Sequence, residues 1–160
     1  MSRGRSLAPY VSSPKEVVRK MLEMADLKPG ELVYDLGSGD GRVPIIAAKE
    51  FNAIGVGVEL KERFVNEAKK KTESMGLDGR VKFVHGDIFE VDLSDADVVT
   101  MYLTTGANEK VRPKLEEELK PGTRVVTHDF SIRKWKFGDS TRFKEGYRSH
   151  TLYIYVWPGR

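Results

Sequence analysis

The sequence predicts an α/β fold, a doubly wound sheet of seven strands that is mostly parallel and ends in an antiparallel hairpin. Three observations predict it. Short apolar runs of strand length alternate with helical patterns through residue 127. A glycine-rich stretch joins the first apolar run to a helix. The last two runs, 142–147 and 151–157, leave no room for a helix between them, so they can pair only in antiparallel fashion.

The first helical pattern follows an irregular N-terminal stretch. Ser13-Pro14-Lys15-Glu16 predicts a capping box with proline at the first helical position. The apolar residues that follow fall on one helical face, and residues 28–30 end the helix. We expect residues 1–30 to form a segment and a helix that cover the ligand side of the sheet.

The remaining elements follow in alternating order, which implies right-handed crossovers between parallel strands. Pro113 is expected to break or restart the last helix. The predicted strands are 31–36, 53–58, 81–85, 97–103 and 124–127, and the predicted helices are 42–51, 61–75 and 108–119.

Size and composition exclude several classes of protein. A chain of 160 residues predicts one domain, residues 1–160. The absence of cysteine excludes disulfides, a thiolate nucleophile and cysteine metal sites, and the three histidines lack metal-binding spacing, so we expect no metal. No apolar run is long enough for a membrane span or a signal core. We therefore expect a cytoplasmic monomer that does not contact membranes.

Charge is unevenly distributed along the chain. The whole carries a net charge of +3, whereas residues 131–160 hold seven Lys or Arg and two Asp or Glu, a net +5. A solvated face explains this pattern more simply than a surface for an acidic partner.

The stretch from Leu32 to Gly41 indicates a nucleotide-type cofactor site on a Rossmann-like fold. It reads Asp-x-Gly-x-Gly-x-Gly, beginning at Asp35 and including Gly37, Ser38 and Gly39. A dinucleotide site has the spacing Gly-x-Gly-x-x-Gly, and a P-loop ends in Gly-Lys-Ser/Thr, so neither pattern fits. An acid at the strand end would repel phosphate and suits a cationic ligand. A glycine-rich turn of some other α/β protein is the alternative.

This run resembles motif I of the seven-stranded S-adenosylmethionine (SAM) methyltransferases, whose cofactor carries a sulfonium and an ammonium but no phosphate. Residues 9–157 as a whole resemble the archaeal protein lysine methyltransferase family and related mitochondrial lysine methyltransferases. The segments that carry this resemblance are 9–14, 33–42, 98–103, 113–116 and 119–129.

Two further acids follow the second and third predicted strands. Glu59 lies 22 residues beyond Gly37, where an acid reaches ribose hydroxyls in nucleotide-binding folds. Leu60 would then lie against adenine. Asp87 resembles the acid that accepts from the adenine amino group, with the N–H of Ile88 donating to the ring. The alternatives are an ordinary surface acid at 59 and a turn aspartate at 87.

The resemblance also implies roles at the two ends of the cofactor. It implies that Tyr10 and Ser12 close over SAM and that Tyr102 and Leu103 lie at the methyl-donor end. The family pattern has Phe near 102 and Glu at 129, where this chain has Tyr and Asp.

Transfer of a methyl group to lysine requires an amine that has lost its proton, which an apolar channel favours by desolvation. We expect Tyr102, the candidate catalytic residue, to wall this channel beside His128 and Asp129. For His128 we expect a structural hydrogen bond in preference to a role as base, and for His85 and His150 we expect no functional role.

The predicted function is SAM-dependent methylation of lysines in a protein substrate. RNA or DNA methylation is an alternative that the basic C-terminal third favours. Against it, positions 101–104 read Met-Tyr-Leu-Thr and not Asn/Asp-Pro-Pro-Tyr. A SAM-binding protein without activity is a further alternative.

Overall fold

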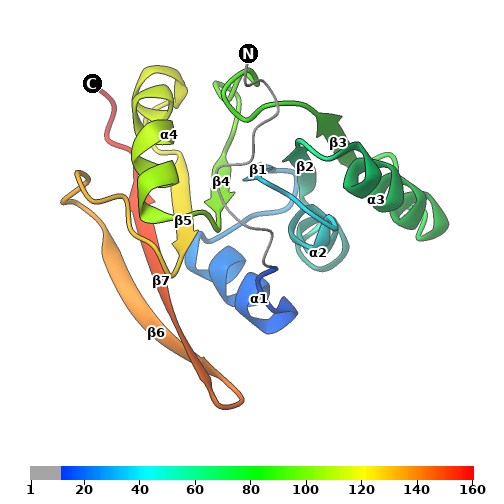
Figure 1. Ribbon diagram of the computed structural model, residues 1–160, viewed down its shortest axis with the longest axis horizontal. Helices are drawn as coiled ribbons and strands as arrows, with labels where there is room; N and C mark the ends of the chain where they lie inside the picture. The colour runs from blue at the N-terminus through cyan, green and yellow to red at the C-terminus, as the bar shows by residue number, and fades with distance from the viewer. Residues whose placement is uncertain (1–11) are drawn as a thin grey trace.

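The computed structural model describes residues 12–160, which form one seven-stranded sheet with helices on both faces (Figure 1). The strand order is β3-β2-β1-β4-β5-β7-β6, and β7 pairs antiparallel with both β5 and β6. This confirms the predicted fold class. The strands are β1 (Leu32–Leu36), β2 (Ile54–Glu59), β3 (Val81–His85), β4 (Val98–Met101), β5 (Arg124–His128), β6 (Asp139–Glu145) and β7 (Arg148–Val156); the helices are α1 (Lys15–Met24), α2 (Arg42–Phe51), α3 (Glu62–Ser74) and α4 (Thr105–Glu118).

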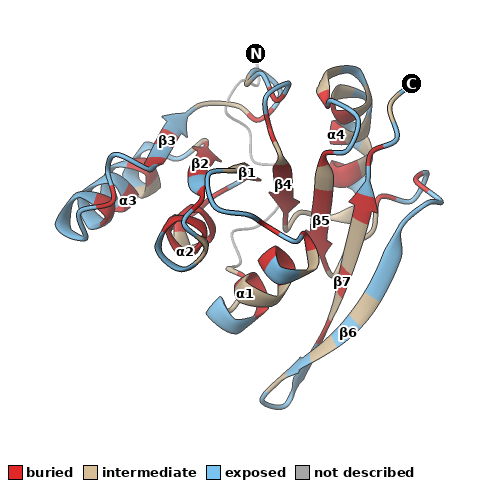
Figure 2. Cartoon of the chain, turned by 180° about the vertical axis from the view of Figure 1, so that it is seen from behind, coloured by how far each residue is buried: buried red, intermediate tan, exposed pale blue. Residues whose placement is uncertain are grey.

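Apolar side chains divide between the two faces of the sheet because successive strand residues alternate in direction. Val33, Val98 and Val126 pack with α1 and α2 on one face. Val99 and Val125 pack with α4 on the other. Figure 2 shows β4 and β5 as buried strands and β6 as a largely exposed edge strand. Within residues 12–160, every helix is too short or too polar to cross a bilayer.

The predicted capping box is wrong. Pro14 precedes the first residue of α1, and no side chain of the described residues caps the helix. The Ser13 hydroxyl bonds instead to His128 at 2.7 Å, 115 positions along the chain. The Ser13 hydroxyl, which the local sequence pattern predicts as a helix cap, is therefore used in a tertiary hydrogen bond instead.

Helix α4 also differs from its prediction. It begins at Thr105, a turn earlier than expected, because the Thr104 hydroxyl accepts a hydrogen bond from the N–H of Ala107. It then continues through Pro113 without a break. Packing of Val111 and Leu115 in the core holds the two halves of the helix in line.

The C-terminal hairpin turns earlier than predicted. Gly146, with a φ of +63°, and Tyr147 form the turn, so Arg148 to His150 belong to β7 and do not separate the strands. The shift places His150 opposite Phe143 and directs its side chain into the protein, where it is 1% exposed.

Two glycines in β2 let the neighbouring layer approach the sheet. A Cβ built on Gly55 would lie 2.6 Å from Pro44 at the start of α2. A Cβ on Gly57 would lie 2.6 Å from the Ser38 side chain and 2.9 Å from Phe83. Close contact between β2 and the glycine-rich loop therefore requires glycine, which has no side chain, at position 57.

We expect Gly57→Ala to lower the free energy of unfolding by about 1–3 kcal/mol, because the added methyl group overpacks the layer beneath Ser38. Gly79→Ala is the matched control, since a Cβ added at Gly79 would meet no other atom of residues 12–160 within 4 Å and its φ is not positive. Urea denaturation of both variants measures the difference. Equal stability of the two variants would contradict the packing role of Gly57.

Candidate active site

A pocket opens at the carboxyl ends of β1 and β4, against the residues that precede α1. It brings together five residues that the sequence predicted for the site: Ser12, Asp35, Gly37, Ser38 and Tyr102. Prediction did not include the other residues of the wall, which are Ser13, Asp40, Arg42 and Val43. Tyr10 lies outside the described residues, so its predicted closing role stays a prediction.

The glycine-rich loop turns sharply between β1 and α2. Gly37, Gly39 and Gly41 have φ values of +85°, +54° and +84°, a backbone region that favours glycine. The N–H groups of Gly37 and Ser38 both donate to the carbonyl of Val58, which fixes the loop on β2. Leu103 lies beside Gly37, where a Cβ added to the glycine would meet it at 3.5 Å.

Ser38 belongs to the pocket wall, and its side chain packs against β2, where a Cβ added to Gly57 would lie 2.6 Å from Ser38 Oγ. Its Oγ is buried and has no hydrogen-bond partner within the described part of the chain. Buried hydroxyls are normally paired, so Ser38 Oγ is an exception at the base of the glycine-rich loop.

The Asp35 carboxyl is buried at the end of β1 and accepts a 2.8 Å hydrogen bond from the Thr100 hydroxyl. Burial raises the pKa of Asp35 to about 7; Thr100 opposes this shift, and the charges of Glu59 and Asp40 add to it. A cation in the pocket would favour the ionised form. The arrangement fits the sulfonium and ammonium of SAM better than a phosphate.

Arg42 ties the residues before α1 to the glycine-rich loop. Its guanidinium donates to Asp40 at 2.7 Å and to the carbonyl of Ser13 at 3.0 Å. Both residues of this ion pair lie within or beside motif I, and their two-residue spacing is the signal that could have identified them.

Glu59 supports the loop through its carboxylate. It accepts from the N–H of Gly39 at 2.7 Å and from the N–H of Lys61 at 3.0 Å. A carboxylate has about four acceptor positions, so two remain for other donors. Its ribose-binding role stays a prediction.

The residues predicted to contact adenine follow β2 and β3 and are not among the residues that line this pocket. Leu60 is half-buried, and its carbonyl accepts from Nε2 of His85 at 2.9 Å. Asp87 accepts from the N–H of Phe89 at 2.9 Å, which is the turn geometry named as its alternative. The Ile88 side chain is buried in the core. Their roles toward adenine remain predictions.

Tyr102, His128 and Asp129 form a cluster at the ends of β4 and β5. The Tyr102 ring stacks on His128 with centroids 3.8 Å apart and an interplanar angle of 26°. The Tyr102 hydroxyl lies 3.5 Å from Asp129 Oδ2, a long contact. Asp129 has a φ of +64°, and its other carboxylate oxygen accepts from the N–H of Thr151 at 3.1 Å. A strained backbone thus holds a carboxylate beside an aromatic wall.

His128 is fully buried and bonded through both ring nitrogens. Nδ1 lies 2.7 Å from the Ser13 hydroxyl, and Nε2 lies 2.8 Å from Nδ1 of His150. Burial lowers the pKa of His128 to about 4; Asp129 opposes this shift, and His150 and Arg148 add to it. His128 is therefore neutral at pH 7.

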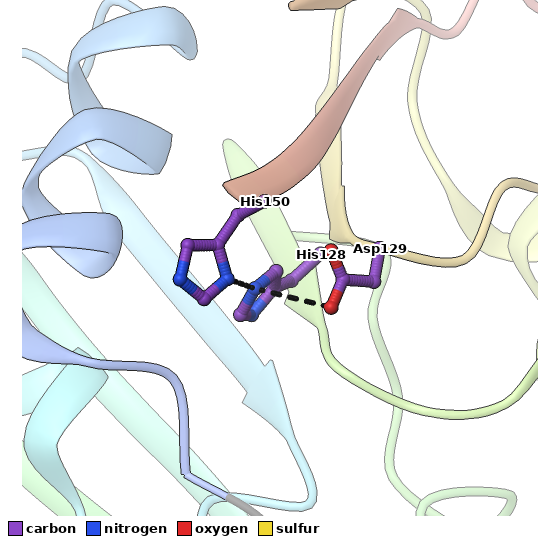
Figure 3. Close-up of side chains that lie close together, drawn as sticks. All are labelled: His128, Asp129 and His150. Carbon is purple, nitrogen blue, oxygen red and sulfur yellow. Dashed lines mark hydrogen bonds and ion pairs between the residues drawn. The ribbon is translucent and has the colours of Figure 1, made fainter. Parts of the chain in front are cut away.

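Figure 3 shows His128, Asp129 and His150 together, and their donor atoms all lie within 4.8 Å of one another. Two imidazoles and a carboxylate are donors that a metal ion accepts. The 2.8 Å between the imidazole nitrogens, however, is a hydrogen-bond distance with a proton between them. The predicted absence of a metal stays a prediction.

Comparison with known proteins places this chain in a family. Residues 35–139 match the family described as the ANTKMT methyltransferase domain. A protein-lysine N-methyltransferase of Saccharolobus islandicus is 51% identical over 149 residues, which are 92% of each chain. The adenine nucleotide translocase lysine N-methyltransferase of Mus musculus is 31% identical over 82% of this chain, which spans only 57% of that relative.

A solved structure supports the cofactor assignment. The RNA methyltransferase from Salinibacter ruber, crystallised in complex with S-adenosyl-L-homocysteine, is 44% identical and has a TM-score of 0.88, covering 94% of this chain and 95% of that one. These matches establish that the chain belongs to the ANTKMT methyltransferase domain family and is a SAM-dependent methyltransferase.

Proposed function

We propose that the protein methylates the ε-amino group of lysine in a protein substrate. The main support for lysine as substrate is the carboxylate of Asp129, which lies beside the half-buried ring of Tyr102 at the edge of the cofactor pocket. A carboxylate attracts an alkylammonium, and an aromatic ring accepts both its charge and its methylene groups. The names of the archaeal and mouse relatives support the same substrate class.

The sulfonium of bound SAM supplies an activated methyl group. The protein must orient the amine and let it lose a proton, since a free lysine has a pKa of about 10.4. Packing against Tyr102 lowers this pKa by desolvation. Asp129, whose side chain is 31% exposed, attracts the ammonium. Its charge opposes this shift, and its exposed oxygens give the proton a route to solvent.

Methylation of RNA is the second candidate. The name of the Salinibacter relative and the basic C-terminal third of the chain favour it. Arg142 and Lys144 lie exposed on the edge strand β6, where a phosphate backbone would find them accessible. Tyr102 and Asp129 favour lysine over this candidate, because a carboxylate pairs with the ammonium of lysine and would repel the phosphates that flank an RNA acceptor.

We expect the affinity for S-adenosyl-L-homocysteine to fall about tenfold from pH 8 to pH 6, because its ammonium favours ionised Asp35 and the group holds a proton below its pKa of about 7. Asp35→Asn should bind more weakly at pH 8 and lose this pH dependence. Calorimetry of both proteins across this range measures the effect. An unchanged pH dependence in the variant would contradict the role of Asp35.

We expect Asp129→Asn to lower kcat/KM for the protein substrate roughly 10- to 30-fold, because the ammonium loses its charged partner. Asparagine tolerates the positive φ at this position and can still accept from Thr151. Asp78→Asn, in an exposed turn, is the matched control. Equal loss of affinity for S-adenosyl-L-homocysteine would instead place Asp129 in the cofactor site.

Tyr102 should act through its ring more than through its hydroxyl. We expect Tyr102→Phe to keep kcat/KM within about threefold, since the stacked ring remains and a long hydroxyl contact contributes little. Tyr102→Ala should lose on the order of tenfold or more, because the wall of the channel opens to water. Similar rates for the alanine and phenylalanine variants would contradict the channel role of Tyr102.

The substrate class is tested by transfer of radiolabel from SAM to a cell extract, followed by protease or nuclease treatment of separate portions. The proposal predicts that protease removes the label and that acid hydrolysis yields methylated lysine. Loss of label to nuclease would assign RNA or DNA as substrate. No label, despite binding of S-adenosyl-L-homocysteine, would support a protein that binds SAM without activity.

A further inference from the structure

A chain of polar contacts runs from the cofactor pocket to the outer hairpin. Ser13 Oγ lies 2.7 Å from Nδ1 of His128, and Nε2 of His128 lies 2.8 Å from Nδ1 of His150. Nε2 of His150 then faces Oε1 of Glu145 at 3.5 Å, the longest of the three links. These contacts join Ser13, two residues before α1, to β5, β7 and β6 in turn.

Chemistry gives this chain a direction. An ionised carboxylate only accepts hydrogen bonds, so the contact with Glu145 requires a proton on Nε2 of His150. Nδ1 of His150 is then an acceptor, and Nε2 of His128 must donate to it. Asp129 Oδ2, 3.6 Å from the same Nε2, favours a proton there as well. Both carboxylates therefore select one tautomer of His128.

The direction continues to Ser13. Because His128 is neutral and carries its proton on Nε2, its Nδ1 accepts and the Ser13 hydroxyl donates. Ser13 is buried on the pocket wall, and Arg42 holds its carbonyl. With its hydrogen committed to His128, Ser13 Oγ offers the pocket only lone pairs. This suits a ligand rich in ammonium and hydroxyl donors.

We propose that Glu145 and His150 are positioning residues for the cofactor: they set the tautomer of His128 so that Ser13 faces the pocket as a hydrogen-bond acceptor. Neither residue lines the pocket. The inference rests on the pocket being the SAM site and is independent of whether lysine or RNA is methylated.

Nitrogen-15 NMR of the histidine rings in the full-length protein at pH 7.5 tests the direction of the hydrogen bonds from Ser13 to Glu145 without any variant. The proposal predicts that His128 is neutral, with its proton on Nε2. In Glu145→Gln the amide can donate to His150, which permits the reversed chain, so the fraction of His128 protonated on Nδ1 should rise. A wild-type His128 that is charged, or that is protonated on Nδ1, would overturn the proposal.

The coupling to the pocket is measured as the affinity for S-adenosyl-L-homocysteine. Glu145→Gln and Ser13→Ala should each weaken binding roughly three- to tenfold, and the double variant should bind no more weakly than Ser13→Ala alone. Asp139→Asn, which removes an acid from the other end of β6, is the matched control and should bind as wild type. Additive losses in the double variant would show that Glu145 does not act through Ser13 and would refute the proposal.

Discussion

The Asp35 carboxyl lies at the end of an interior strand, where Thr100 donates a hydrogen bond and the charges of Glu59 and Asp40 raise the pKa of Asp35. An isolated carboxylate in such a place is costly, and the group responds by holding its proton to a higher pH. The three acids lie together because parallel strands end at a common edge and the glycine-rich loop carries Asp40 back over it. A ligand with positive charge relieves the repulsion, whereas a phosphate would increase it. The position of these strand ends therefore favours a ligand with positive charge over a phosphate.

The residues before α1 complete the pocket through contacts that are distant in sequence. Arg42 of α2 donates to the Ser13 carbonyl, and His128 of β5 is hydrogen-bonded to the Ser13 hydroxyl. A helix and a sheet strand therefore both hold this short segment. His128 also carries the Tyr102 ring on its face. One buried imidazole therefore contacts two residues of the pocket wall, Ser13 and Tyr102. A change in the hairpin that moves His150, and with it His128, would alter the positions of both Ser13 and Tyr102.

The alternation of apolar runs and the glycine spacing were sufficient to predict the sheet, its parallel order and the pocket residues Asp35, Gly37 and Ser38. These features depend on local sequence, which is why they could be predicted. Ser13 was assigned to a helix cap because its partner lies 115 residues away and nothing nearby indicates it. His150 was placed between two strands because the turn was assigned too late; the turn at Gly146 instead directs it onto His128. The pairing of β5 with β7 creates this contact, and no spacing in the chain reveals it.

The most direct measurement is a carbon-13 NMR titration of the Asp35 carboxyl in the protein, with and without S-adenosyl-L-homocysteine. We expect a midpoint near pH 7 in the free protein and an ionised carboxyl at about pH 6 once the ligand is bound. An ordinary aspartate midpoint near pH 4 in the free protein, or a carboxyl that stays protonated in the complex, would contradict the claim that this buried acid selects a cationic cofactor.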